Sequence, residues 1–286
     1  MVKISKGKIM EIIKASGEKE SYDKEKLCNS LLQIGVSSDV VERICRKVET
    51  KIKSGMSTER LHAITFQQLR KENPAFSAKY NLKRAMMQLG PAGFLFERYV
   101  AAILQEYGYT TKVGQILQGV CVSHEIDIVA EKENSHFFVE VKYHNARGVK
   151  SDVTVAMYSY ARFLDLKEAV EKIERFPAPH KAWIVTNTKF TSKAIEFAEC
   201  RKVKMTGWHY PSGESLEFLI EQKFLYPVTV LPSLSRSRWE QFAKAGLMFA
   251  KDVVSFEPSE LAKNIGIPTS LSTVLIREAL SLKELR

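Results

Sequence analysis

The chain has 286 residues, of which 45% are hydrophobic and 27% charged, and its formal charge is +10 at pH 7. Two or three domains, each with its own core, fit this length. No apolar run approaches the ~20 residues of a membrane span, and the amino terminus lacks a secretory apolar core, so we expect a cytoplasmic protein without a membrane partner. The positive charge favours an anionic partner, either nucleic acid or nucleotide.

The sequence of residues 1–89 predicts a short β segment followed by helices. Apolar sequence around Ile12 is strand-like, and residues 15–18 supply a hairpin turn. Asp23 is a candidate cap for a first helix with an apolar stripe, and Ser57 lies at another capped start. A helix through Tyr80 to Leu89 closes this segment.

Residues 90–226 follow a different pattern, which begins at the turn sequence Gly90-Pro91-Ala92-Gly93. Helical and strand-like stretches alternate after it. They are a helix at 94–107, strands near Val113, Val120, 126–129 and 137–143, a helix at 152–175, a strand at 182–186, a helix at 191–200 and a strand at 203–208. This order predicts an α/β sandwich with a mixed sheet.

Residues 227–286 are predicted to be all helical, so the chain as a whole is a multi-domain α/β protein. Two similar phrases occur there, at residues 243–247 and 262–267, and each is a helix end, a glycine and an apolar residue. The four cysteines, Cys28, Cys45, Cys121 and Cys200, are far apart and form no Cys-x-x-Cys pair. We therefore expect reduced thiols and no structural zinc.

Charged side chains within strand-like sequence carry the strongest chemical signal. The strand period of two puts Glu140 and Lys142 on one face, and Asp127 is flanked by isoleucines. Such charges must be compensated if they are desolvated. Mg²⁺ prefers oxygen ligands and keeps several waters, so Asp127, Glu140 and the carbonyl of Val141 could hold it.

Phosphodiester hydrolysis would need this cation as well as the amine. Enzymes remove ~8–23 kcal/mol of barrier, whereas proton transfer by one side chain supplies roughly 3–5 kcal/mol. Lys142 would orient or deprotonate the attacking water and offset charge on the phosphate. Glu97 lies beside the apolar stripe of the preceding helix and can point toward the sheet, and His124 and His144 flank the site. The alternative is an ordinary ion pair between Glu140 and Lys142 on an edge strand.

This middle segment resembles the PD-(D/E)xK nuclease superfamily, specifically the Mrr-like restriction endonucleases, over roughly residues 91–210. The matching stretches are residues 93–97, 125–129, 139–142 and 184–187, followed by Phe190, Thr191 and Ala194. The resemblance implies Mg²⁺- or Mn²⁺-dependent cleavage of double-stranded DNA, with Asp127, Glu140 and Lys142 catalytic and Glu97 supporting them. A catalytically silent member that only binds DNA is the alternative.

The amino-terminal segment, about residues 5–90, resembles an ATP-cone, a nucleotide-sensing module. The resemblance implies that Lys14 and Lys26 contact the phosphates of ATP or dATP, and that four further residues lie near the base, ribose or phosphates: Ile12, Glu20, Asp23 and Thr58. Ala15 replaces the second basic residue usual in that family. The chain has no phosphate-binding loop of the Gly-x-x-x-x-Gly-Lys-Ser/Thr type, so the nucleotide is expected to be an effector. A degenerate cone that only mediates oligomer contacts is the alternative.

The carboxy-terminal repeat resembles a helix-hairpin-helix pair. Gly246 and Gly266 would let the backbone approach DNA phosphates, and basic side chains would add attraction that salt weakens: Arg236, Arg238 and Lys244. A small helical packing or dimerisation domain is the alternative.

Together these observations predict a metal-dependent DNA endonuclease controlled by ATP or dATP, with restriction or defence against foreign DNA as its expected role. One active site cuts one strand, so a homo-oligomer, a dimer or larger, is expected. The rival hypothesis is a nucleotide-responsive DNA-binding regulator with an inactive nuclease scaffold.

Overall fold

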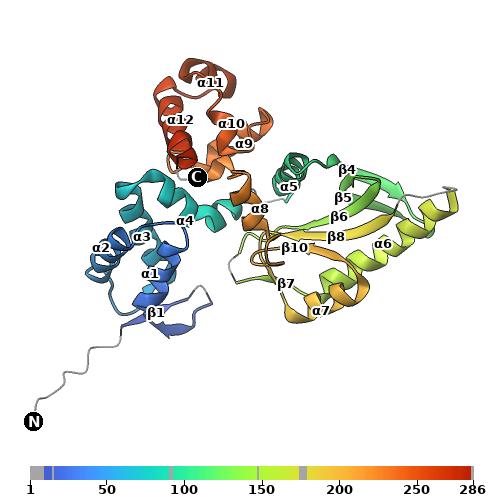
Figure 1. The fold of residues 1–286 in the computed structure, drawn as a ribbon, viewed down its shortest axis with the longest axis horizontal. Helices are drawn as coiled ribbons and strands as arrows, with labels where there is room; N and C mark the ends of the chain where they lie inside the picture. The colour runs from blue at the N-terminus through green and yellow to red at the C-terminus, as the bar shows by residue number, and fades with distance from the viewer. Residues whose placement is uncertain (1–9, 15, 90–92, 147, 174–178, 285–286) are drawn as a thin grey trace, which may run out of the picture.

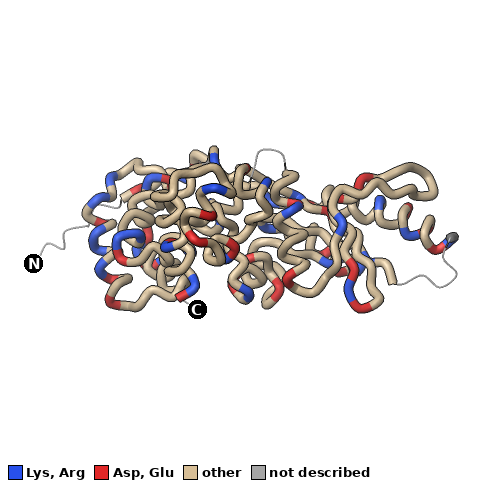
Figure 2. The backbone as a smooth tube through the Cα atoms, turned by 90° about the horizontal axis from the view of Figure 1, so that it is seen from above, with Lys and Arg blue, Asp and Glu red and all other residues tan. Residues whose placement is uncertain are grey.

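The computed structural model describes residues 10–14, 16–89, 93–146, 148–173 and 179–284. Figure 1 shows three regions: an amino-terminal helical region, a central sheet with its helices, and a carboxy-terminal group of helices that lies against the junction of the other two. No described helix combines the length and the apolarity that a bilayer crossing requires. Lysine and arginine are spread over all three regions (Figure 2).

The amino-terminal region combines a small sheet with four helices. Its sheet has the order β2-β1-β3, with β1 antiparallel to β2 and parallel to β3. Asp23 caps α1 by accepting a hydrogen bond from the Lys26 backbone N–H, and Ser57 caps α3 in the same way through Arg60. The elements are β1 (Glu11–Ile13), β2 (Lys19–Ser21), α1 (Lys24–Leu32), α2 (Ser38–Glu49), β3 (Met56–Ser57), α3 (Thr58–Glu72) and α4 (Pro74–Met86).

A disulfide in this region corrects the expectation that all four cysteines are reduced thiols. Cys28 of α1 and Cys45 of α2 are bonded, with 6.3 Å between their Cα atoms. The packing of α1 against α2 brings them together, which a separation of 17 residues could not reveal. Cys121 and Cys200 are free and exposed.

The central region is built on a five-stranded mixed sheet of order β10-β8-β6-β5-β4. Strands β4, β5 and β6 are antiparallel neighbours, whereas β6, β8 and β10 are parallel. The elements are α5 (Phe94–Glu106), β4 (Thr110–Gln118), β5 (Ser123–Lys132), β6 (Ser135–Lys142), β7 (Lys150–Ser151), α6 (Val153–Ile173), β8 (His180–Thr186), β9 (Lys189–Phe190), α7 (Ser192–Arg201) and β10 (Lys204–Thr206).

Helices cover both faces of this sheet (Figure 1). Val139 and Val141 of β6 belong to the hydrophobic core shared with α5, while Phe138 belongs to the core against α6 and α7. The predicted α/β sandwich is therefore confirmed. The predicted strand at Val120 is wrong, because β4 ends at Gln118 and the side chain of Val120 is 41% exposed.

The carboxy-terminal region is helical, as expected. After α8 (Leu216–Gln222), which ends the 90–226 segment, its elements are a 3₁₀ turn (Val228–Val230), α9 (Arg236–Lys244), α10 (Ala250–Val253), α11 (Pro258–Ile265) and α12 (Thr269–Lys283). The expectation of one core per domain is wrong here. One hydrophobic cluster runs from Leu82 and Met86 of α4 through α5 to Leu275 of α12. Helix α4 contributes to two regions because its outer face packs on the 3₁₀ turn and α12.

Candidate active site and nucleotide pocket

Glu140 lies on the central strand of the sheet and is buried. Strand β6 is flanked by β5 and β8, and the Glu140 residue is only 7% exposed. The alternative of an ordinary ion pair between Glu140 and Lys142 is therefore wrong in placing the pair on an edge strand, although the pair itself is present. A carboxylate in such a place costs free energy unless cations or donors compensate it.

Two cations compensate Glu140. One carboxylate oxygen lies 2.7 Å from Nζ of Lys142, on the same face of β6, and the other lies 2.5 Å from Nη1 of Arg162 on α6. The Arg162 side chain is 12% exposed, whereas that of Lys142 is 34% exposed, so the amine keeps access to solvent. Arg162 was not expected from the sequence, because nothing but its place on a helix distinguishes it.

Strand β5 is irregular at Asp127, because the residues on either side of it pack into different hydrophobic cores. Ile126 packs in the core against α6 while Ile128 packs in the core against α5, although a regular strand would turn both to one face. The ladder between β4 and β5 skips Asp127 and its neighbour Gly114, whose φ is 63°. The carboxylate of Asp127 instead accepts a 2.6 Å hydrogen bond from the backbone N–H of Val141. It thereby joins β5 to β6 beside Glu140.

Glu97 completes a group of carboxylates around this point. A Cβ added to Gly93 would lie 3.5 Å from Oε1 of Glu97 and 3.9 Å from Cβ of Tyr143, which places the start of α5 at the end of β6. Burial first, then the charge of Asp127, raise the pKa of Glu97 to about 7. Burial and the charge of Glu140 raise the pKa of Asp127 to about 6. Four expected residues are thus brought together: Glu97, Asp127, Glu140 and Lys142.

The donor set fits a divalent cation. Among the described residues, no three His, Cys, Asp or Glu side chains form a group that could hold a metal by themselves. Mg²⁺ commonly uses one or two carboxylates together with several waters, so this does not conflict with two carboxylate ligands. Glu97, Asp127 and Glu140 repel one another, and a bound metal cation would reduce this repulsion.

The chain beyond Lys142 is held by residues that the sequence did not mark for this role. The Thr186 hydroxyl donates to the Lys142 carbonyl, and the Asn187 side chain both accepts from the His144 N–H at 2.9 Å and donates to its carbonyl at 2.8 Å. Thr186 and Asn187 are both fully buried. They are positioning residues for the end of β6; the signals for them were their place at the end of the buried strand β8 and within the matching stretch 184–187.

His124 has a structural partner. Its Nε2 lies 2.7 Å from Asp165, which also accepts a 2.8 Å hydrogen bond from the backbone N–H of Cys121. These donors hold the pKa of the Asp165 carboxyl well below its usual range. A Cβ at Gly119 would meet the same carboxylate at 2.1 Å, so only glycine fits there. Asp165 therefore ties the β4–β5 turn to α6.

The six residues expected to bind nucleotide line one cavity of about 280 Å³ in the amino-terminal region: Ile12, Lys14, Glu20, Asp23, Lys26 and Thr58. Glu20 lies between two of them, with 2.6 Å to Nζ of Lys14 and 2.9 Å to Nζ of Lys26. Hydrogen bonds from these lysines lower the pKa of Glu20 to about 2. Ala15 lies outside the described residues.

The two expected DNA-contacting glycines both follow a helix. Gly246 and Gly266 have φ of 78° and 76°, and a Cβ on either would meet no atom within 4 Å. The backbone at both turns is therefore open to approach. Arg238 and Lys244 lie on α9, as does Arg236, whose side chain is outside the description.

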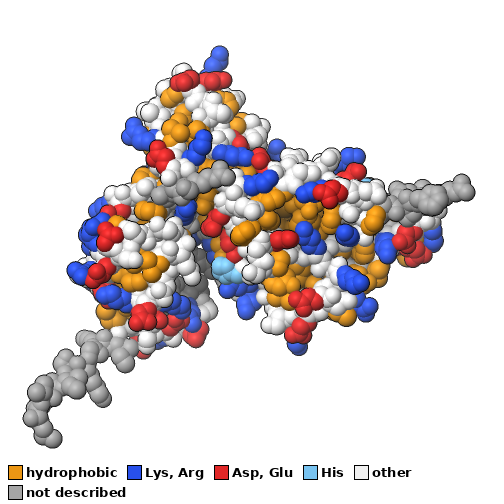
Figure 3. Space-filling view, viewed as in Figure 1, with side chains coloured by type: hydrophobic (Ala, Val, Ile, Leu, Met, Phe, Trp, Pro, Cys, Tyr) orange, Lys and Arg blue, Asp and Glu red, His pale blue; other side chains and the backbone are white. Residues whose placement is uncertain are grey.

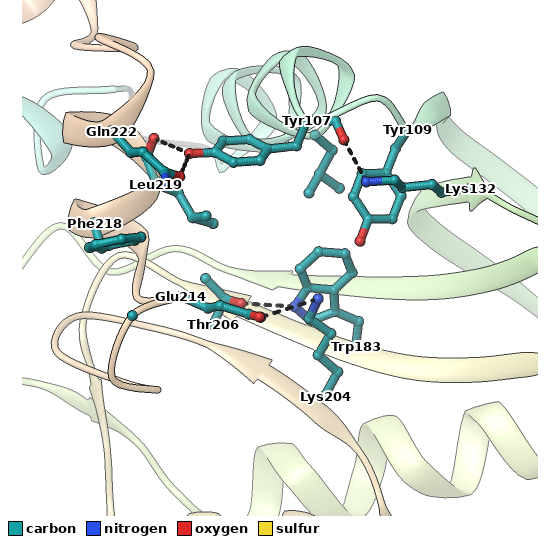
Figure 4. Close-up of a pocket in the computed structure, with 12 residues that line it drawn as sticks. Tyr107, Tyr109, Lys132, Trp183, Lys204, Thr206, Glu214, Phe218, Leu219 and Gln222 are labelled. Atoms are coloured by element: carbon teal, nitrogen blue, oxygen red, sulfur yellow. Dashed lines mark hydrogen bonds and ion pairs between the residues drawn. The ribbon is translucent and has the colours of Figure 1, made fainter.

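A cavity of about 410 Å³ at the other end of the strands contains none of the expected site residues (Figure 4). Aromatic rings line it, including Trp183 and Tyr109. Its amines have partners within the protein: Nζ of Lys132 donates to the Tyr107 carbonyl at 3.0 Å, and Nζ of Lys204 lies 4.0 Å from the ring centroid of Trp183. Because these charges are already compensated, we assign this cavity no ligand.

Comparisons with known proteins agree with this arrangement. The family described as ATP cone domain matches residues 10–86, the Mrr catalytic family, described as restriction endonuclease, matches residues 92–207, and the family described as AF1548-like, C-terminal, matches residues 226–282. An uncharacterized protein of Archaeoglobus fulgidus is 42% identical over 180 residues, which cover 63% of this chain and 97% of that protein. The crystal structure of a protein of unknown function, AF1548, is 38% identical with a TM-score of 0.56, covering 65% of this chain and 96% of that one.

The fold and the site thus define a restriction-endonuclease-like protein with an amino-terminal ATP cone and a helical carboxy-terminal part. Since the chain covers nearly the whole of its Archaeoglobus relative at 42% identity, it belongs to the AF1548-like family.

Proposed function

We propose that this protein is a metal-dependent DNA endonuclease whose activity responds to ATP or dATP. One observation carries the nuclease part of the proposal. Two carboxylates from adjacent strands, Asp127 and Glu140, meet beside an amine that is paired yet reachable from solvent. A module that only binds DNA has no need to bury these charges together.

The residues would divide the work between them. Asp127, Glu140 and the carbonyl of Val141 would hold Mg²⁺ or Mn²⁺, which when bound supplies Lewis-acid stabilisation of the phosphate and a more acidic water. Lys142 would orient or deprotonate the attacking water and offset the charge that develops on the phosphate. Arg162 would keep the second oxygen of Glu140 in place, 2.5 Å from its Nη1.

The nucleotide would act through the cone pocket. Glu20 forms ion pairs with both Lys14 and Lys26, and a polyphosphate would compete with its carboxylate for these two amines. Coupling energies between distant sites are typically ~1–3 kcal/mol, so we expect ATP or dATP to change cleavage by roughly 5- to 150-fold.

Cleavage of supercoiled plasmid in the presence of Mg²⁺ tests the nuclease proposal. Lys142→Ala should abolish cleavage, whereas Lys172→Ala should leave it intact, because Lys172 of α6 is exposed and, within the described part of the chain, pairs with Glu168. Cleavage that survives in the Lys142→Ala protein would refute the assigned site. Repeating the assay with and without ATP separates the regulatory claim from the chemical one.

The second candidate is a nucleotide-responsive DNA-binding regulator. It is favoured by the ion pairs that Glu140 makes with Lys142 and Arg162, because these two side chains compensate its charge within the protein. A calorimetric titration with Mn²⁺ distinguishes the two: the regulator gives no heat that depends on Asp127, and it cuts no DNA.

The carboxy-terminal helices and the assembly complete the proposal. The open turns at Gly246 and Gly266, together with the basic residues Arg236, Arg238 and Lys244 of α9, would contact DNA phosphates. A second copy of the chain would supply the second cut of a duplex. The large exposed hydrophobic side chains of α6, Met157, Tyr158 and Leu164, offer a surface for it, which sedimentation of the purified protein would test.

A further inference from the structure

A third cavity lies between the cone and the nuclease region, and it contains none of the expected site residues. Its volume is about 330 Å³, and its lining comes from α1, α3 and α4 of the cone and from the segment that follows the catalytic strand: Ser30, His62, Tyr80, Lys83, Arg84, Met87 and Gly148. The surface is hollowed between these two lobes (Figure 3). We call it the junction cavity.

The charge of the junction cavity is one-sided. Lys83, Arg84 and His62 contribute basic groups, and no carboxylate is among the lining residues. Glu59 forms an ion pair with Arg84: its oxygen lies 3.6 Å from Nη2, beyond hydrogen-bond range, on a side chain that is 78% exposed. The electrostatics therefore favour an anion.

Arg84 supplies the specific observation. Its side chain is 20% exposed, and its Nε and Nη2 atoms are buried without a hydrogen-bond partner among the described residues. Buried guanidinium donors normally find acceptors, because leaving them unsatisfied costs free energy. Two unpaired donors on one fork match the two oxygens of a phosphate, which arginine binds in a bidentate manner.

The position of the cavity connects it to the active site. Gly148 belongs to the segment between β6, which carries Lys142, and β7. Met87 also lines the cavity, and its carbonyl accepts a 2.6 Å hydrogen bond from the hydroxyl of Tyr143, the residue after Lys142. An anion held here would lie beside the catalytic strand, whereas the cone pocket already has Lys14 and Lys26 for the phosphates of its nucleotide.

We propose that the junction cavity binds a backbone phosphate of the DNA substrate, with Arg84 as its bidentate contact. This inference rests on the proposed nuclease function and deepens it. It also explains how a nucleotide could affect DNA, since Ser30 and Tyr80 line both the cone pocket and the junction cavity.

The test measures DNA and ATP binding on the same full-length proteins. In a Lys142→Ala background, which prevents cleavage, the affinity for a labelled duplex is followed by fluorescence anisotropy between 50 and 300 mM salt. Arg84→Gln should weaken binding about tenfold at low salt and reduce the slope of log affinity against log salt by about 0.9, the value for one lost phosphate contact. Affinity for ATP, measured by calorimetry, should not change.

Two further variants sharpen the result. Arg84→Lys keeps the charge but not the fork, so it should restore the salt slope while binding remains weaker than with arginine. Arg46→Gln is the matched control, because Arg46 is an exposed arginine of α2 paired with Glu42, and it should change neither affinity.

Three outcomes overturn or redirect the inference. Unchanged DNA binding in Arg84→Gln would overturn it, even if the intact protein cuts DNA. A loss of ATP affinity with unchanged DNA binding would assign the phosphate to the cone nucleotide and also overturn it. If the parent protein neither binds nor cuts DNA, then the proposed function itself fails, and the inference fails with it.

Discussion

The cone pocket and the proposed catalytic cluster both gather charged side chains, but they balance them differently; this cluster comprises Glu97, Asp127, Glu140, Lys142 and Arg162. In the cone pocket Lys14 and Lys26 share Glu20, and the side chain of Lys26 is 70% exposed. In the catalytic cluster Lys142 and Arg162 face Glu97, Asp127 and Glu140, and burial and repulsion raise the pKa of two of these acids. Exposed side chains can exchange partners at little cost, whereas the repulsion between buried carboxylates persists unless a cation offsets it. The first arrangement suits reversible sensing, and the second suits holding a cation.

After Lys142→Ala, which should abolish cleavage, the largest effect should come from Asp127→Asn. The amide keeps an acceptor for the Val141 N–H, 2.6 Å away in the parent, but removes a negative charge from the site. We expect cleavage of plasmid to fall roughly 10³-fold, in line with the loss of one preorganised electrostatic group. The circular dichroism spectrum and melting temperature should stay close to the parent values. A variant that cuts normally would show that the catalytic cluster is not built around this carboxylate.

Arg162→Met should have the next largest effect. The carboxylate of Glu140 would lose one of its two cations, and such supporting contacts typically change metal affinity or activity by about 10- to 100-fold. Stability should also fall, because a buried charge loses a partner. Adding Glu140→Gln should restore the melting temperature but not the cleavage. If the double variant melts no higher than the single one, Arg162 does not act by compensating Glu140.

Lys14→Ala and Lys26→Ala should each weaken ATP binding about tenfold, the value of one charge-assisted hydrogen bond. Lys24→Ala is the control, since Lys24 is also on α1 but pairs with Glu49 and does not line the pocket. Calorimetry gives the affinities, and the response of cleavage to ATP should weaken in the same variants. Equal losses in all three proteins would contradict a pocket-specific role.

The smallest effect concerns stability against pH at Asp165. Its folded pKa is depressed, first by the Cys121 N–H and then by His124, so its contribution is present above the unfolded pKa and is lost as pH falls toward the folded one. Asp165→Asn should lower the melting temperature near pH 7, and the deficit should shrink below about pH 4, near the unfolded carboxyl pKa. Cleavage should persist at temperatures where the variant is folded. A deficit that is constant from pH 7 to pH 3 would contradict this account.

Much of the fold followed from local sequence. The caps Asp23 and Ser57, the period-two strand that carries Glu140 and Lys142, and the helix that carries Glu97 all depend on short-range geometry, so the sequence predicted them. The resemblance to an ATP cone and to Mrr-like nucleases likewise rested on residue patterns, and the matching families agree with it.

Tertiary structure decided what the sequence could not. Arg162 meets Glu140, Cys28 meets Cys45, and α4 joins the cone to the carboxy-terminal helices only because separate elements pack together. The sequence determined which residues could be buried or charged, since periodicity and composition are local properties. Which charges are compensated, and which donors lack a hydrogen-bond partner as at Arg84, depends on contacts between elements far apart in the chain, and only the packed fold sets those distances.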